Sequence, residues 1–127
     1  MNNSISVVKI KEILMVTMPP DPDDSIVADL QEEILNAMER NASQGLVLDI
    51  SCVETVDSYF ARTVTETARM VTLMGGRTII AGMRPTVAVT ATEIGLTLGD
   101  IETALSVDRA FDQITSPRQT CRSISRQ

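Results

Sequence analysis

The chain has no histidine and no tryptophan, and its 127 residues include one tyrosine, two phenylalanines and two cysteines. Without histidine it lacks the commonest general base and the commonest metal ligand of proteins. A Ser-His-Asp hydrolase is excluded for that reason. Glycine-rich phosphate loops of the G-x-G-x-x-G or Walker type are also missing from the sequence. These absences favour a protein that is not an enzyme and that uses no metal or cofactor.

The composition is that of a single acidic domain with an aliphatic core. Hydrophobic residues make up 43% of the chain, aromatic residues 2%, and the net charge is −6. An acidic balance disfavours binding to nucleic acid or to anionic membranes. No apolar run approaches the roughly 20 residues of a membrane span, and no signal-peptide pattern is visible. Cys52 and Cys121 lack metal-like spacing, so we expect reduced cysteines, Cys52 as a small buried residue or a free thiol, and a cytoplasmic protein.

Hydrophobic periodicity predicts the element order β-β-α-β-α-β-α-β-α. Strands are expected at residues 5–10, 13–16, 46–50, 78–81 and 101–105. The helices are expected to begin at Asp23 or Asp24, near Ser58, at Pro85, and at Ser106 or Asp108. This order predicts an α/β fold with a mainly parallel sheet, an antiparallel edge and about four helices. Residues 1–115 would form the domain, and the polar residues 116–127 a disordered tail.

The stretch from residue 46 to residue 74 is predicted to form an apolar, buried strand, a short loop and an amphipathic helix. Four of residues 46–50 are aliphatic, which is typical of a strand covered on both faces. A helical stripe then follows at spacings of four and three residues, made by Phe60, Val64, Thr67, Val71 and Met74. Gly75 and Gly76 are expected to end this helix.

Ser58 has two interpretations. Asp57 and Ser58 are both residue types that cap helices, so one interpretation makes Ser58 a simple N-cap. The other interpretation makes its hydroxyl a phosphate acceptor, since helix amides and the helix dipole favour an anion at the start of a helix. A phosphate would add roughly −1.5 to −2 charges without requiring the domain to unfold. The residues alone leave both interpretations open.

Three carboxylates near the end of the central strand suggest a further alternative. Asp49, Glu54 and Asp57 are expected where α/β proteins usually bind ligands. Three carboxylates are able to hold magnesium, so a metal-dependent or small-ligand enzyme is a minor hypothesis. Tyr59, beside Ser58, is interpreted either as a contact residue for a partner or as a rim or core residue.

Several segments resemble a STAS domain, the fold of anti-anti-sigma factors, and within it stressosome scaffold proteins of the RsbS type. The resemblance covers about residues 5–114 and rests on LVLDISCVETVDSYFAR, LMGGRTIIAGMRPTVAVT, EIGL and DIETALSVDRAF. It implies a scaffold and antagonist that joins RsbR-like STAS proteins in a large pseudo-icosahedral assembly. The alternative within this family is a free anti-anti-sigma factor that binds an anti-sigma kinase directly.

The resemblance also implies roles for individual residues. An RsbT-like switch serine kinase would be held by the assembly and released once it phosphorylates Ser58 during stress. A PP2C-type phosphatase would reset that serine. Thr90 lies near a second phosphorylation position of RsbR-type proteins, although a helix threonine without such a role is the simpler interpretation. The residues expected to contact partners are Asp57, Tyr59, Glu54 and Asp49.

Overall fold

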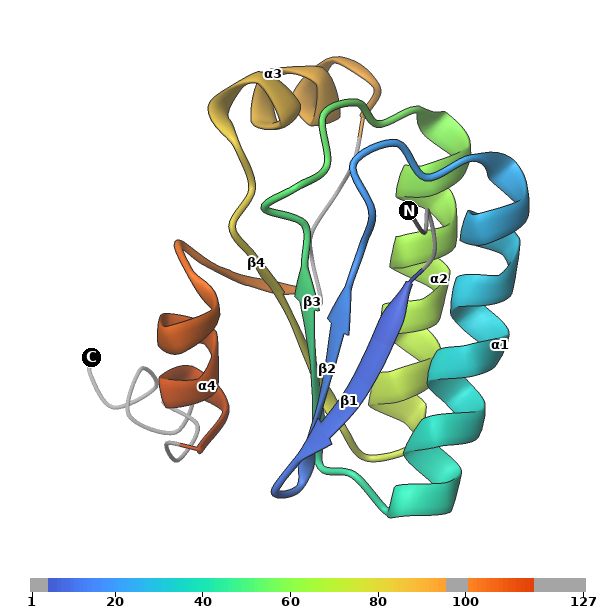
Figure 1. Cartoon of the computed structure of the whole chain (residues 1–127), viewed down its shortest axis with the longest axis vertical. Coiled ribbons are helices and arrows are strands. Elements are labelled where there is room, and N and C mark those ends of the chain that lie inside the picture. The colour runs from blue at the N-terminus through green and yellow to red at the C-terminus, as the bar shows by residue number, and fades with distance from the viewer. Residues whose placement is uncertain (1–4, 96–100, 116–127) are drawn as a thin grey trace, which may run out of the picture.

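The computed structural model describes residues 5–95 and 101–115 of the chain. Within these residues the elements follow the predicted order (Figure 1). The strands are β1 (Ser6–Ile10), β2 (Ile13–Thr17), β3 (Gly45–Asp49), β4 (Arg77–Ala81) and β5 (Glu102–Ala104). The helices are α1 (Asp24–Asn41), α2 (Ser58–Leu73), α3 (Pro85–Glu93) and α4 (Val107–Thr115).

The strands form one sheet in the order β1-β2-β3-β4-β5. The β1 and β2 strands pair antiparallel, and the remaining neighbours pair in parallel. In the register of the centre, Leu46 pairs with Leu14 on one side and with Thr78 on the other. The predicted α/β fold, with a mainly parallel sheet and an antiparallel edge, is therefore confirmed.

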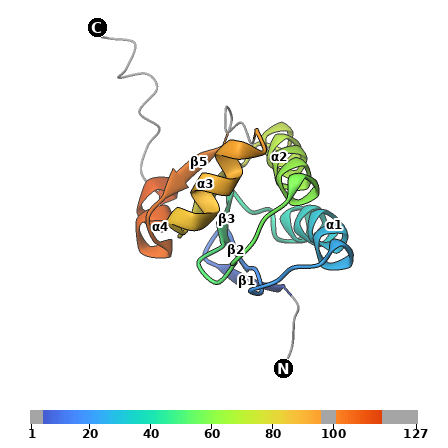
Figure 2. The same cartoon turned by 90° about the horizontal axis from the view of Figure 1, so that it is seen from above.

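Helices cover both faces of the sheet. The α1 and α2 helices pack side by side on one face, α4 lies on the other, and α3 crosses above the ends of the strands (Figures 1 and 2). Successive side chains of a strand point to opposite faces. Leu46 and Leu48 accordingly belong to the core under α1 and α2, whereas Val47 belongs to the smaller core under α4. This double coverage explains the continuous apolar run of β3.

The structure shows which of the predicted residues cap α1 and α4. Asp23 caps α1, and Ser106 caps α4 by accepting a hydrogen bond from the backbone N–H of Arg109 at 3.3 Å. Pro85 stands at the first position of α3, as predicted. The chain leaves α2 through Gly75, whose φ of +94° is a conformation that favours glycine.

Two sequence predictions need correction. Met74 was expected in the buried stripe of α2, but it follows the last helical residue and is 47% exposed. The helix ends there, so the periodicity that buries the preceding stripe residues no longer applies. For Cys52 the buried alternative is wrong, because the residue is exposed, and the free-thiol alternative is confirmed.

The predicted tail at residues 116–127 lies outside the described residues. Among the helices of residues 5–95 and 101–115, none combines the length and apolar character needed to cross a membrane.

Candidate functional site

The loop between β3 and α2 (residues 50–57, the β3–α2 loop) is fixed by hydrogen bonds to several segments. Its Ile50 N–H donates to Ala81 of β4, and its Glu54 N–H donates to Pro20 of the segment before α1, each at 3.0 Å. The guanidinium of Arg84 donates through Nε to the carbonyl of Ser51 at 2.9 Å. These hydrogen bonds therefore fix the position of the loop and, with it, the start of α2.

Gly82 allows the chain after β4 to approach this loop closely. A Cβ atom at residue 82 would lie 2.9 Å from the Cβ of Ser51, and the glycine has a φ of +78°. A larger residue would be strained there and would push the loop away. The position of the β3–α2 loop thus depends on glycine at this point.

Asp57, not Ser58, is the N-cap of α2. Its backbone is extended, with φ −129° and ψ −178°, and its Oδ1 accepts a hydrogen bond from the Phe60 N–H at 2.8 Å. Ser58 is the first helical residue and is exposed. Within the described residues no hydrogen bond involves the Ser58 hydroxyl, so the interpretation of Ser58 as an N-cap is wrong. The capping requirement is met by its neighbour, which leaves the hydroxyl uncommitted at the surface.

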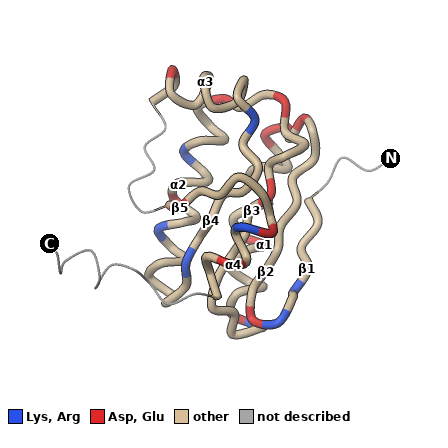
Figure 3. Tube along the Cα trace, turned by 90° about the vertical axis from the view of Figure 1, so that its left-hand side faces the viewer, with Lys and Arg blue, Asp and Glu red and all other residues tan. Residues whose placement is uncertain are grey.

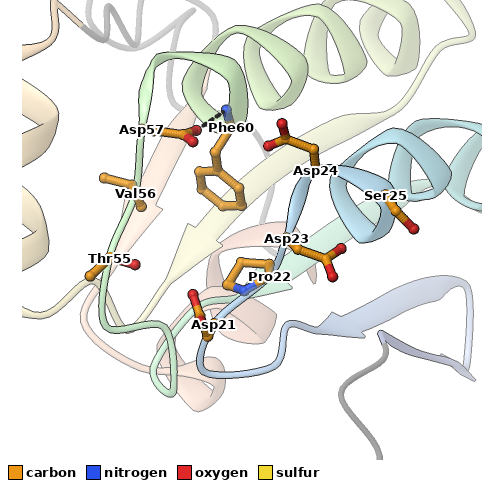
Figure 4. A pocket seen from close by; sticks show the side chains of 9 residues that line it. All are labelled: Asp21, Pro22, Asp23, Asp24, Ser25, Thr55, Val56, Asp57 and Phe60. Carbon is orange, nitrogen blue, oxygen red and sulfur yellow. Dashed lines mark hydrogen bonds between the residues drawn. The ribbon is translucent and has the colours of Figure 1, made fainter.

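On the Asp57 side of the helix start there is a groove of about 600 Å³, here called the acidic groove. The starts of both α1 and α2 contribute to it, and the Phe60 ring lies between the two segments (Figure 4). Its lining includes four carboxylates, which belong to Asp21, Asp23, Asp24 and Asp57. Two of these are engaged as helix caps, since Asp23 accepts from the Ile26 N–H at 3.0 Å and Asp57 accepts from Phe60.

On the Ser58 side there is a second groove, of about 290 Å³, here called the arginine groove. One wall is the exposed face of α2 and the other is the end of α3. The residues that line it are Ser58, Ala61, Arg62, Thr65, Glu66, Arg69, Ile94 and Gly95. Figure 3 shows basic segments along α2 and acidic segments at the loops above the sheet. Ser58 therefore stands between surfaces of opposite charge.

The other predicted site residues are spread around this helix start. Asp49 is half-buried, and its carboxylate accepts a hydrogen bond from the Ser51 N–H at 3.0 Å. Glu54 is exposed on the β3–α2 loop. Tyr59 is half-buried against the core, and the guanidinium carbon of Arg62 lies 6.0 Å from the centre of its ring.

The proposed magnesium site does not form. In the part of the chain that the structure describes, no group of three acidic, cysteine or histidine side chains could hold a metal ion. The carboxylate of Asp49 turns to the backbone of its own loop, and that of Asp57 turns to the first turn of α2. The hypothesis of a metal-dependent enzyme built on Asp49, Glu54 and Asp57 loses its structural basis.

Thr90 lies within α3 and is half-buried. Its hydroxyl donates to the Thr86 carbonyl at 3.1 Å, a bond within one helix. This geometry is that of an ordinary helix threonine.

Arg62 and Arg69 were not among the predicted site residues. They follow Ser58 by four and eleven residues, a spacing that puts all three on one helix face. That spacing is visible in the sequence. The opposite wall, which comes from Ile94 and Gly95, depends on the tertiary fold.

Comparison with known proteins identifies the family. Residues 4–110 match the STAS domain. The chain belongs to the STAS domain family. It is 32% identical to Moorella thermoacetica RsbS S58E, with a TM-score of 0.78, covering 93% of this chain and 97% of that one.

Two further relatives are a chain of a stressosome structure and a protein named as a co-antagonist. A chain in a structure of the molecular architecture of the stressosome is 31% identical, with a TM-score of 0.76, covering 96% of this chain and all of that one. The RsbT co-antagonist protein RsbRA of Bacillus subtilis is 28% identical over 82 residues, 65% of this chain but 30% of RsbRA. This STAS domain is therefore of the stressosome type. The chain spans about a third of the length of RsbRA and of RsbRB, a second RsbT co-antagonist protein of Bacillus subtilis.

Proposed function

We propose that this chain is a non-catalytic stressosome scaffold and antagonist that holds a switch serine kinase until Ser58 is phosphorylated. The observation that carries the proposal is the state of the Ser58 hydroxyl. It is exposed at the first position of α2, while Asp57 performs the capping that would otherwise occupy it.

A phosphate at Ser58 would change the surface and leave the fold in place. It would add roughly −1.5 to −2 charges at the positive end of the α2 dipole, where an anion is favourable. Phe60 and Ala61, two and three positions after Ser58, are buried, so the first turn of α2 is anchored independently of the serine. Stress signalling through this residue would therefore alter partner binding while the domain remains folded.

The added charge would oppose a partner that covers Ser58. An interface closing over the phosphate would have to desolvate it, and an acidic partner surface would be repelled. Together these effects would cost a few kcal/mol, enough to move a kinase from bound to free. The side chains proposed to contact the partner around Ser58 are those of Asp57, Tyr59, Glu54 and Asp49.

The names of the relatives support the choice of partners. RsbRA is a co-antagonist of RsbT, so we propose an RsbT-like kinase as the protein held. The similarity to a chain of the stressosome supports co-assembly with RsbR-like STAS proteins in a large complex. A PP2C-type phosphatase would return the phosphoserine to serine.

The test is reconstitution with an RsbR-type protein and the RsbT kinase, followed by size-exclusion chromatography with light scattering. We expect very large particles that retain the kinase and release it after ATP is added. The matched variant Ser58→Ala should assemble equally and keep the kinase in the presence of ATP. Release from Ser58→Ala at the wild-type level would contradict the switch. Small one-to-one complexes with the kinase alone would indicate a free anti-anti-sigma factor instead.

A further inference from the structure

The arginine groove offers a positive site next to Ser58 in a chain whose net charge is −6. Ser58 and Arg62 are separated by one helical turn, and both line the groove. Side chains four residues apart on a helix are neighbours on its surface. Arg69 lies on the same face two turns further along.

Among the described residues that line the arginine groove, three carry a charge. The α2 wall carries Arg62 and Arg69 with Glu66 between them, and the α3 wall adds the uncharged Ile94 and Gly95. The carboxylates of the acidic groove stand on the other side of the helix start. A phosphate on Ser58 would thus meet positive charge in one direction and four aspartates in the other.

Arg62 is available to bind such an anion. It is exposed, and the ion pair that the structure records among the described residues joins Arg77 to Glu102 instead. Its recorded contact is with the ring of Tyr59, at 6.0 Å from the ring centre. A cation–π contact at an exposed site is weak, and a phosphate dianion is the stronger partner for a guanidinium.

We propose that Arg62 receives the phosphate of phosphorylated Ser58 in the arginine groove and leaves the face of Tyr59 as it does so. This inference rests on the proposed modification of Ser58 and adds how that modification changes the surface. In the unmodified chain Arg62 is free to pair with an acidic segment of the bound kinase. After phosphorylation that arginine is neutralised from within the same helix, so a partner loses an attractive contact and also meets the new negative charge.

The first test is a phosphorus NMR titration of the protein with phosphoserine introduced at position 58 during translation. Pairing with a guanidinium favours the dianion, so Arg62→Gln should raise the second pKa of the phosphate by about 0.2 to 0.4. Arg69→Gln removes the same charge from the same helix face, about two turns beyond Arg62 and therefore further from the phosphate, and should have a smaller effect. Equal pKa values in wild type and Arg62→Gln, or equal effects of both variants, would overturn the role of Arg62.

Because no kinase is needed, this result is independent of whether a kinase chooses Ser58. Absence of enzymatic phosphorylation would contradict the proposed function while leaving the titration interpretable. A titration without an Arg62 effect would contradict this inference and leave the switch itself standing.

Tyrosine fluorescence provides a second readout. Tyr59 is the one tyrosine of the chain and tryptophan is absent, so the intrinsic emission reports on this ring alone. Removal of Arg62 from the ring should contribute to the emission change caused by phosphoserine at 58. That change should be smaller in Arg62→Gln and unaltered in Arg69→Gln. The same change in all three proteins would show that Arg62 does not move from the ring.

Discussion

The starts of α1 and α2 are capped alike but differ in charge at the first helical residue. Each is capped by an aspartate that accepts the N–H of the third residue after it, at 3.0 Å for Asp23 and 2.8 Å for Asp57. The next residue is Asp24 in α1 and Ser58 in α2. The first helix therefore carries a carboxylate where the second carries a hydroxyl. Negative charge at this position is compatible with the fold, and α2 lacks it in its unmodified form.

The two helix starts also differ in how firmly they are anchored. The residue whose N–H donates the capping hydrogen bond is Phe60 in α2, which is 6% exposed, and Ile26 in α1, which is half-buried. Phe60 lines the acidic groove, and its ring lies between the two segments (Figure 4). The start of α2 is thus held by a buried side chain while its serine is exposed. A site whose charge changes while the domain stays folded requires this combination.

The largest expected effect comes from removing the anchor of each helix. Phe60→Ala should lower the free energy of unfolding by about 3 to 5 kcal/mol, because it leaves a cavity beneath the start of α2. Ile26→Ala should cost clearly less, since part of that side chain is already in water. Urea denaturation of both variants measures the difference. Equal losses would show that the two helix starts are anchored alike.

The next effect concerns the kinase. Ser58→Asp should weaken binding of the RsbT-type kinase at least about tenfold, which corresponds to roughly 1.4 kcal/mol. Asp24→Asn changes the charge by one unit in the opposite direction at the matching position of α1 and should alter the affinity much less. Calorimetry with the purified kinase would measure both. A larger effect of Asp24→Asn would place the kinase interface on α1 instead.

Removing the caps should give a smaller effect on stability. Asp57→Ala is expected to cost about 1 to 2 kcal/mol and Asp23→Ala about 0.5 to 1 kcal/mol. The difference follows from the shorter, partly buried bond of Asp57 and the exposed bond of Asp23. The asparagine variants keep a side-chain acceptor and should recover most of each loss in thermal melts. Full loss in Asp57→Asn would mean that the carboxylate acts through something other than the cap.

The smallest effect is expected for the serines themselves. Ser58→Ala and Ser25→Ala should each change the free energy of unfolding by no more than about 0.5 kcal/mol, because both residues are exposed and neither is the cap. Chemical denaturation of the two variants is the measurement. A loss near 1 kcal/mol in Ser58→Ala alone would return that hydroxyl to a capping role.

The order of elements could be predicted because strands and helices place apolar residues at different periods. The run at 46–50 predicted a central strand covered on both faces, and β3 lies in the middle of the sheet. The choice between Asp57 and Ser58 as cap could not be predicted, since both side chains suit that position. It is decided by the extended backbone of Asp57, which the β3–α2 loop and its hydrogen bonds impose.

The site was predictable only where it is local. Asp57, Ser58 and Tyr59 come together because they are consecutive at a helix start. The three-carboxylate hypothesis failed because sequence proximity does not reveal which way a side chain turns, and Asp49 turns to the backbone N–H of Ser51. The arginine groove required the fold, since its second wall arrives from the end of α3.

The most direct test of the central claim is intact-mass spectrometry with site mapping after incubation with the RsbT-type kinase and ATP. The account predicts one added phosphate, located on Ser58, and none on the Ser58→Ala variant. The absence of a phosphate, or its location at Thr90 or elsewhere, would contradict the assignment of Ser58 as the switch.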